Sequence, residues 1–209
     1  MSPGVASVDS IGLDEVRHGG GPLDLPAFRA GPGVTWIVDA GTGAADVLLE
    51  RLAGVRPADG TRVWNGQPAA GAELSAWQRR TTLVPDRPWE AGHLSVVQSL
   101  RLAALLWEVP AARERIGREI SRWGLAGIGR RRLAELSGGE RRRVLLAASL
   151  VPDPLVWLVA GGSRDLDAPG QVVWSCLLTR VHFGLPLAPR IAVVTGELCP
   201  ALANARIEV

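Results

Sequence analysis

One stretch of this sequence decides its fold: Leu136-Ser137-Gly138-Gly139-Glu140, followed by Arg141-Arg142-Arg143 and an apolar run. Ser137 and Glu140 have the spacing of a capping box, in which a serine caps a helix and a glutamate three residues later reaches back to it. A capping box alone leaves the two glycines unexplained, because glycine in a first turn costs helix stability. We therefore predict that a helix starts after Ser137 and that its glycines allow close approach of a ligand. A capping box with no ligand is the alternative.

Length and composition favour one sizeable domain. The chain has 209 residues and 47% hydrophobic residues, enough for an α/β core with a small insertion. The longest apolar stretch, 144–162, is interrupted by Pro152-Asp153-Pro154, so no membrane span is expected. Cys176 and Cys199 are too few and too far apart for a disulfide framework or a zinc site, and we expect no metal site.

The basic residues, 23 in number, are all arginine, which a G+C-rich genome explains. Without lysine, the chain cannot contain a phosphate-binding lysine. The net charge of +2 is too small to indicate a nucleic-acid partner. Two arginine clusters flank the helix start, and we expect them to be solvated: Arg130-Arg131-Arg132 and Arg141-Arg142-Arg143.

Apolar, β-branched runs predict buried strands at 34–38, 81–84, 155–159 and 191–195. A glycine-containing loop leads from the first strand into a helical pattern, 45–52, that stops at Gly54. Between 89 and 133 the apolar period is helical, and Pro110 separates two helices. Strands on both sides of a helical insertion predict a layered α/β core. We expect a single domain, with its core at 1–86 and 150–209 and a helical subdomain at 87–149.

Residues 136–140, here called the signature segment, resemble the signature sequence of ATP-binding cassette (ABC) ATPases. The rest of the chain can be aligned with that family in order. The resemblance implies an α/β fold with a P-loop NTPase-like (ABC ATPase) core and an inserted helical subdomain. In this family the signature of one subunit closes over the ATP held by another. Leu166 and Asp167 resemble the end of the D-loop, which reaches across the same dimer.

The segment that resembles the family's phosphate loop lacks the usual side chains. It contains Gly41, Thr42, Gly43, Ala44, Ala45 and Asp46. Ala45 stands where a lysine would reach phosphate, and Asp46 where a hydroxyl would hold Mg²⁺. Two unit charges about 4 Å apart repel by about 4 kcal/mol at an effective dielectric near 20, so Asp46 opposes phosphate. We expect this vestigial loop to be filled by Asp46 at the helix start. As an alternative, Asp46 is an ordinary helix-start residue.

Other family positions also depart from the pattern. Asp86 replaces the Q-loop glutamine, Ala160 and Gly161 replace the two Walker B acids, and Gly196 replaces the switch histidine. These groups position metal, water or the γ-phosphate, and losing one such group typically costs about 10²- to 10³-fold in rate. We therefore expect no catalytic residue and no hydrolysis at this chain's own site.

The resemblance implies a non-hydrolysing nucleotide-binding-domain subunit of an asymmetric ABC transporter. It would pair with an active ABC ATPase subunit, supply its signature segment to that partner's ATP, and dock on a transmembrane permease. ATP and Mg²⁺ would be held only at a composite site, mainly by the partner. The protein would lie in the cytoplasm, on the inner face of the cell membrane.

Two other functions remain open. The chain could be a regulatory or scaffold protein that has kept the fold and does not use ATP. It could also be an enzyme that uses unconventional acids, namely Asp46, Asp86 or Glu197. We expect no basic group near these acids to hold a triphosphate, which disfavours the enzyme.

Overall fold

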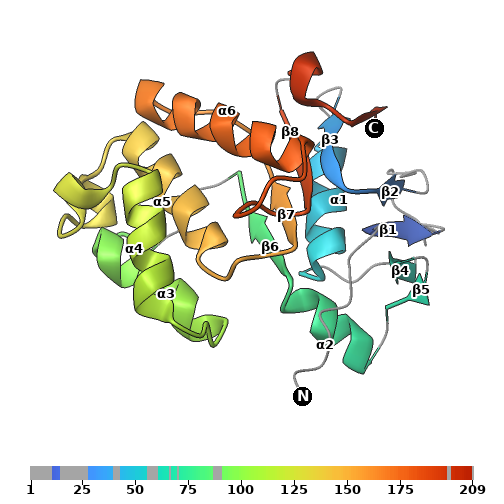
Figure 1. Ribbon diagram of the computed structural model, residues 1–209, viewed down its shortest axis with the longest axis horizontal. Helices are drawn as coiled ribbons and strands as arrows, with labels where there is room; N and C mark the ends of the chain where they lie inside the picture. Colours follow the sequence, from blue (N-terminus) through green and yellow to red (C-terminus); the bar gives the residue numbers. More distant parts are fainter. Residues whose placement is uncertain are drawn as a thin grey trace.

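The computed structural model describes residues 11–14, 28–39, 43–55, 61–65, 67–69, 71–86, 91–196 and 199–208. Its larger sheet has five parallel strands in the order β6-β7-β8-β3-β9 (Figure 1). They are β3 (Gly33–Val38), β6 (Thr81–Val84), β7 (Val156–Val159), β8 (Ile191–Thr195) and β9 (Ala205–Glu208). The predicted α/β fold is confirmed.

A smaller antiparallel sheet has the strand order β2-β1-β4-β5. Its strands are β1 (Ile11–Asp14), β2 (Phe28–Ala30), β4 (Thr61–Trp64) and β5 (Gln67–Pro68). This sheet could not be predicted from the sequence, since its strands have two to four residues and show no strong alternation.

Six α-helices complete the described structure: α1 (Ala44–Ala53), α2 (Ala72–Gln78), α3 (Val96–Leu106), α4 (Ala112–Arg122), α5 (Gly138–Leu150) and α6 (Ala168–His182). Helices α3 and α4 lie on either side of Pro110, as predicted. Helix α1 ends at Gly54, whose φ of 77° suits glycine at a helix C-terminus. Single 3₁₀ turns occur at Ala126–Ile128, Leu133–Glu135 and Pro200–Leu202. Among the helices described, none is long and apolar enough to cross a membrane.

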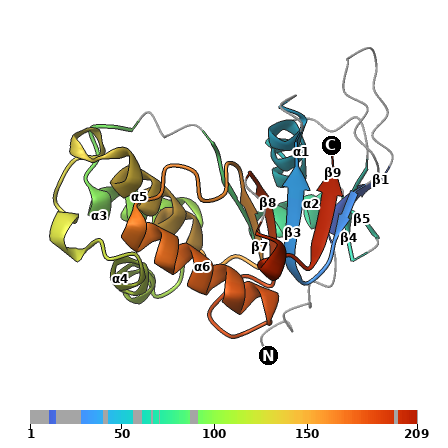
Figure 2. The same cartoon turned by 90° about the horizontal axis from the view of Figure 1, so that it is seen from above.

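Both faces of the parallel sheet are buried, as expected for a sheet covered by helices on either side. In β8, Ala192 and Val194 belong to the cluster that includes α5 and α6, whereas Ile191 and Val193 belong to the cluster around α1. Figure 2 shows α1 and α6 on different sides of the strands. The apolar run of β8 therefore serves two cores, one on each face.

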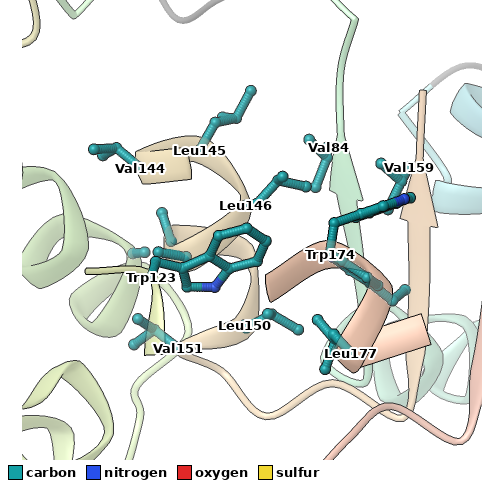
Figure 3. Packing of buried hydrophobic residues seen from close by; sticks show 14 of the residues in the cluster. Val84, Trp123, Val144, Leu145, Leu146, Leu150, Val151, Val159, Trp174 and Leu177 are labelled. Atoms are coloured by element: carbon teal, nitrogen blue, oxygen red, sulfur yellow. The ribbon is translucent and has the colours of Figure 1, made fainter. Parts of the chain in front are cut away.

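Helices α3, α4 and α5 form a group beside the sheet (Figure 1). The core of this group continues into the sheet without a break, because Trp123, Leu146, Trp174 and Val159 belong to one buried cluster (Figure 3). Helix α5 is thus packed against both the helical group and the strands, and it carries the signature segment at its N-terminus.

Candidate functional site

The signature segment forms the start of α5, and its capping box is present. The Ser137 hydroxyl accepts a hydrogen bond from the Glu140 amide at 3.2 Å. The Glu140 carboxylate accepts one from the Ser137 amide at 2.8 Å. These bonds, with a smaller contribution from Arg131, lower the pKa of Glu140 below its ordinary value. The helix start predicted from the sequence is therefore confirmed.

The two glycines of the signature segment have different surroundings. A Cβ atom on Gly139 would lie 2.9 Å from the backbone nitrogen and the Cβ of Asp167, and 3.2 Å from the Asp165 carbonyl oxygen. A Cβ atom on Gly138 would have no described atom within 4 Å. Packing inside the chain therefore gives Gly139 a reason that does not depend on a ligand. At Gly138 no described atom occupies the space that a side chain would take.

The loop between β7 and α6, residues 160–167, lies against the start of α5. Its last residue, Asp167, caps α6 by accepting a hydrogen bond from the Gly170 amide at 3.0 Å. The same carboxylate forms an ion pair with Arg143 of α5 at 3.0 Å. Leu166 packs against the main core. The residues that resemble the end of the D-loop and the signature segment therefore form one continuous face.

Arg142 and Arg143 are buried, with exposed fractions of 7% and 8%. The prediction of a solvated arginine cluster is wrong for these two residues, and Arg141 alone of the three is exposed. The Arg142 guanidinium donates to the carbonyl oxygens of Pro85 (3.1 Å), Ala160 (2.5 Å) and Gly162 (3.1 Å). Burial of a guanidinium requires such partners, and here they come from the ends of β6 and β7.

The start of α1 holds a carboxylate, but not in the predicted way. Gly43 is the N-cap and has no side chain to cap the helix, and the Ala45 amide donates to Asp39 Oδ2 at 3.1 Å. Asp39, directly after β3, therefore occupies the position expected for Asp46. Ala44 and Ala45 are buried. Gly41 and Thr42 lie outside the described residues.

Asp46 lies in the first turn of α1 and faces other acids. Burial raises its pKa, and the nearby charges of Asp86 and Asp39 raise it further, while Arg164 opposes the shift. Asp46 and Asp86 line a cavity of about 330 Å³ together with Val47, Leu49, Glu50, Leu83, Pro85 and Ala160. In the described part of the chain, no group of three metal-ligating side chains comes together.

Three of the departing positions pack against one another. An Asp86 carboxylate oxygen occupies the space that a side chain on Gly161 would need. A Cβ atom on Gly196 would lie 3.1 Å from the Gly161 carbonyl carbon. Gly161 and Gly196 have φ angles of 73° and 115°, values that residues other than glycine rarely adopt. The Gly161 amide donates to Thr195 Oγ1 at 2.9 Å, which fixes this close contact.

Asp86 also pairs with Arg164 at 2.8 Å. The expectation of no basic group near the unconventional acids is therefore wrong for Asp86. Both arginines close to it are already engaged within the chain: Arg164 by Asp86 itself, Arg142 by three carbonyls. Glu197 lies outside the described residues. With Asp39 on the α1 amide and Asp46 and Asp86 in the cavity, these residues do not fit a magnesium triphosphate.

The comparison with protein families decides the membership of this chain. The family model described as ABC transporter matches residues 41–159, more than half of the sequence. The chain belongs to the ABC transporter family of ATP-binding domains. ABC ATPases generally bind ATP together with Mg²⁺.

Curated relatives of this ABC domain act in several transport systems. The molybdenum import ATP-binding protein ModC of Rhodospirillum rubrum is 30% identical over 167 residues, covering 76% of this chain and 44% of that protein. The cytochrome c biogenesis ATP-binding export protein CcmA of Tatumella citrea is 30% identical, covering 69% and 68%. The chain spans about half the length of the first curated relatives it matches.

Solved structures show the same fold at low identity. An ATP-binding subunit of an ABC transporter matches with a TM-score of 0.77 and 16% identity, covering 96% of this chain and 88% of that chain. An ABC transporter ATP-binding protein from Pyrococcus furiosus matches with a TM-score of 0.75 and 15% identity, covering 96% and 97%. These matches support the fold of the ABC domain.

Three residues of this candidate site were not predicted from the sequence: Asp39, Arg142 and Arg164. Asp39 accepts from the Ala45 amide, 6 residues further along the chain, whereas the two arginines reach Pro85 and Asp86 only through tertiary contacts. Asp39 had a usable signal, because it directly follows a predicted buried strand that leads into a helix. Arg142 and Arg164 had no such signal in the sequence, because no spacing distinguishes a buried arginine from its exposed neighbour.

Proposed function

We propose that this ABC domain is a nucleotide-binding subunit that does not hydrolyse ATP at its own site and completes the ATP site of an active partner subunit. Its signature segment would meet the γ-phosphate of ATP held by the partner. We further propose that the pair docks on a transmembrane permease at the inner face of the cell membrane. ATP and Mg²⁺ would then be held mainly by the partner.

One observation carries this proposal: the first turn of α5 is open, whereas the start of α1 is filled. At α5, Gly138 leaves the N-terminal amides approachable, and Ser137 and Glu140 hold the turn in place. Amides and the helix dipole at such a terminus favour an approaching phosphate. At α1, the Ala45 amide is already bound to Asp39.

The lack of side chains for hydrolysis supports the same division of roles. Ala160, Gly161 and Gly196 offer no side chain that could hold metal, activate water or contact a γ-phosphate. The carboxylates of Asp46 and Asp86 would repel the γ-phosphate. A chain that retains the groups facing a neighbour and lacks those for its own ATP is best explained as a silent member of an asymmetric pair.

The sharpest test is Ser137→Asp in the natively purified assembly. Aspartate caps a helix about as well as serine, so α5 is expected to fold normally. The added charge would face the partner's γ-phosphate, and we expect ATP turnover of the assembly to fall by about 10²-fold or more. Turnover is measured as phosphate release, with the subunits identified by mass spectrometry.

Ser121→Asp provides the matched control, because it adds the same charge on an exposed face of α4, away from the signature segment. Turnover of this variant should equal that of the unmodified assembly. If Ser137→Asp also leaves turnover unchanged while the subunits remain together, the domain does not contribute to ATP use. The scaffold function that does not use ATP would then be the better explanation.

A further inference from the structure

Three arginines tie the signature helix and the loop 160–167 to the rest of the chain. Arg142 of α5 binds carbonyls that follow β6 and β7. Arg164 of the loop binds Asp86, which follows β6. Arg143 of α5 joins Asp167 at the end of the loop to the Trp123 carbonyl after α4, at 3.0 and 2.8 Å. Every one of these contacts joins segments far apart in sequence.

These contacts converge on the face that carries the signature segment. Arg142 holds α5 against the strand ends, and Arg164 holds the loop against the end of β6. The loop in turn packs closely at Gly139, because a Cβ atom there would lie 3.2 Å from the Asp165 carbonyl oxygen and 2.9 Å from the Asp167 backbone nitrogen. A displacement of the loop would therefore displace the first turn of α5, including Ser137 and Gly138.

The chemistry of Arg142 indicates that it positions the helix rather than merely filling space. Its guanidinium is buried, and its charge is balanced at longer range by Asp86 and Asp165. Burying a cation is costly, and an apolar residue of similar volume would pack the same gap more cheaply. An apolar side chain, however, could not hold the carbonyl oxygens of Pro85, Ala160 and Gly162 in one arrangement.

We propose that Arg142 and Arg164 are positioning residues that hold the signature helix and the loop 160–167 in a preformed arrangement without any nucleotide. The arginines fix this face from within the chain, so the surface offered to the partner's ATP does not depend on occupancy of the chain's own site. The functional part of this inference rests on the proposed function. The structural part concerns the isolated chain and can be tested separately.

The structural test is amide hydrogen exchange of the full chain, comparing Arg142→Gln, Arg164→Gln and the control Arg141→Gln. Hydrogen bonds from charged groups are individually strong, and local opening governs exchange in such segments. We expect Arg142→Gln to accelerate exchange of the hydrogen-bonded amides of Glu140 and Arg141, and of residues 160–167, by about tenfold or more. Arg164→Gln should accelerate residues 160–167, and Arg164→Lys should restore most of the protection. Arg141→Gln, in the same helix but exposed, should behave as the unmodified chain.

Unchanged exchange in both Arg142→Gln and Arg164→Gln would overturn the inference. If Arg142→Gln instead accelerates exchange throughout β3 and β8, the arginine supports the whole fold, and its positioning role is refuted. Arg164→Gln then decides whether an arginine positions the loop 160–167. The Arg164 side chain is 60% exposed, so its loss should leave the core intact.

The link to ATP is tested in the assembly with Arg164→Gln. When only a fraction of the assemblies holds the signature helix and the loop 160–167 in the binding-competent arrangement, the apparent affinity for ATP is reduced by that fraction. We therefore expect KM for ATP to rise several-fold while kcat changes little, a division that general destabilisation would not produce. If exchange responds but neither Arg164→Gln nor Ser137→Asp alters turnover, the proposed function fails and the positioning role stands. If Ser137→Asp alone alters turnover and exchange does not respond, the positioning role fails and the proposed function stands.

Discussion

At the scale of single residues, the positions that depart from the family pattern fit one another. The Asp86 carboxylate fills the space beside Gly161, and Gly196 packs on the Gly161 backbone. Restoring a glutamate at position 161 would force it against Asp86 and into a backbone conformation with φ of 73°. A glutamate introduced at position 161 alone would therefore be strained, both by Asp86 and by its own backbone conformation.

Glu140 gives a pH prediction at the same scale. Its pKa is lowered from the ordinary value of 4.5 by the Ser137 amide and hydroxyl and by Arg131. A carboxyl whose folded pKa lies below its unfolded pKa contributes stability above the unfolded value, and this contribution is lost as the pH falls through the folded pKa. We expect the first turn of α5 to lose protection below about pH 4.5, measured by amide exchange at Glu140 and Arg141.

Glu140→Gln is the matched control for this pH dependence. Glutamine can complete a capping box without titrating. Protection of the first turn in this variant should therefore vary little between pH 6 and pH 3, apart from the intrinsic exchange rate. An equal acid-induced loss in both proteins would show that another group is responsible.

At the scale of elements, the start of α5 serves two purposes with two adjacent glycines. Gly139 lets the loop 160–167 pack against the helix, and Gly138 leaves the space beside it open. Under the proposed function, the helix would pack against its own chain at Gly139 and remain accessible to the partner's ATP at Gly138, within a single turn.

Alanine substitution separates the two roles. Gly139→Ala should destabilise the isolated chain by about 1–3 kcal/mol, because its Cβ would overlap Asp167. Gly138→Ala should leave stability unchanged or raise it by up to about 1 kcal/mol, since alanine favours helix. Denaturant unfolding of the isolated chain measures both. A comparable loss in both variants would contradict the assignment of Gly138 to the open side.

At the scale of the whole molecule, the parallel sheet holds two cores and places the ends of its strands at one edge. The loops after β3, β6 and β7 bring Asp39, Asp86 and Ala160 to that edge, where α1 and α5 also begin. At this edge the Asp39 carboxylate binds the Ala45 amide, and Asp86 pairs with Arg164. The Asp46 carboxylate lies among other acids, which would oppose a bound triphosphate.

Magnesium ATP should therefore fail to stabilise the isolated chain. A ligand present at 100 times its Kd would add about 2.7 kcal/mol of stability, which corresponds to a rise of several degrees in Tm for a chain of this size. We expect no rise in Tm at millimolar ATP and Mg²⁺, measured by thermal unfolding. The active partner subunit, tested in parallel, should show the rise. A clear increase for the isolated chain would overturn the view that its own site excludes nucleotide.

The sequence alone determined features that depend on near neighbours. Buried strands appeared as β-branched runs, and the start of α5 as a serine and a glutamate three residues apart, because these signals act within a few positions. The family resemblance then placed Asp86, Ala160, Gly161 and Gly196 at one site, and the structure brings Asp86, Gly161 and Gly196 into contact and sets Ala160 beside Asp86 in the same cavity.

Only the tertiary structure decided which charged groups are buried and which neighbours they meet. Arg141, Arg142 and Arg143 read alike in sequence, yet the turn of the helix exposes the first and directs the other two into the chain. Gly139 owes its presence to Asp167, 28 positions away, and that distance hides the contact from any local pattern. Burial and long-range contact depend on how elements pack, and packing is settled only when the whole chain has folded.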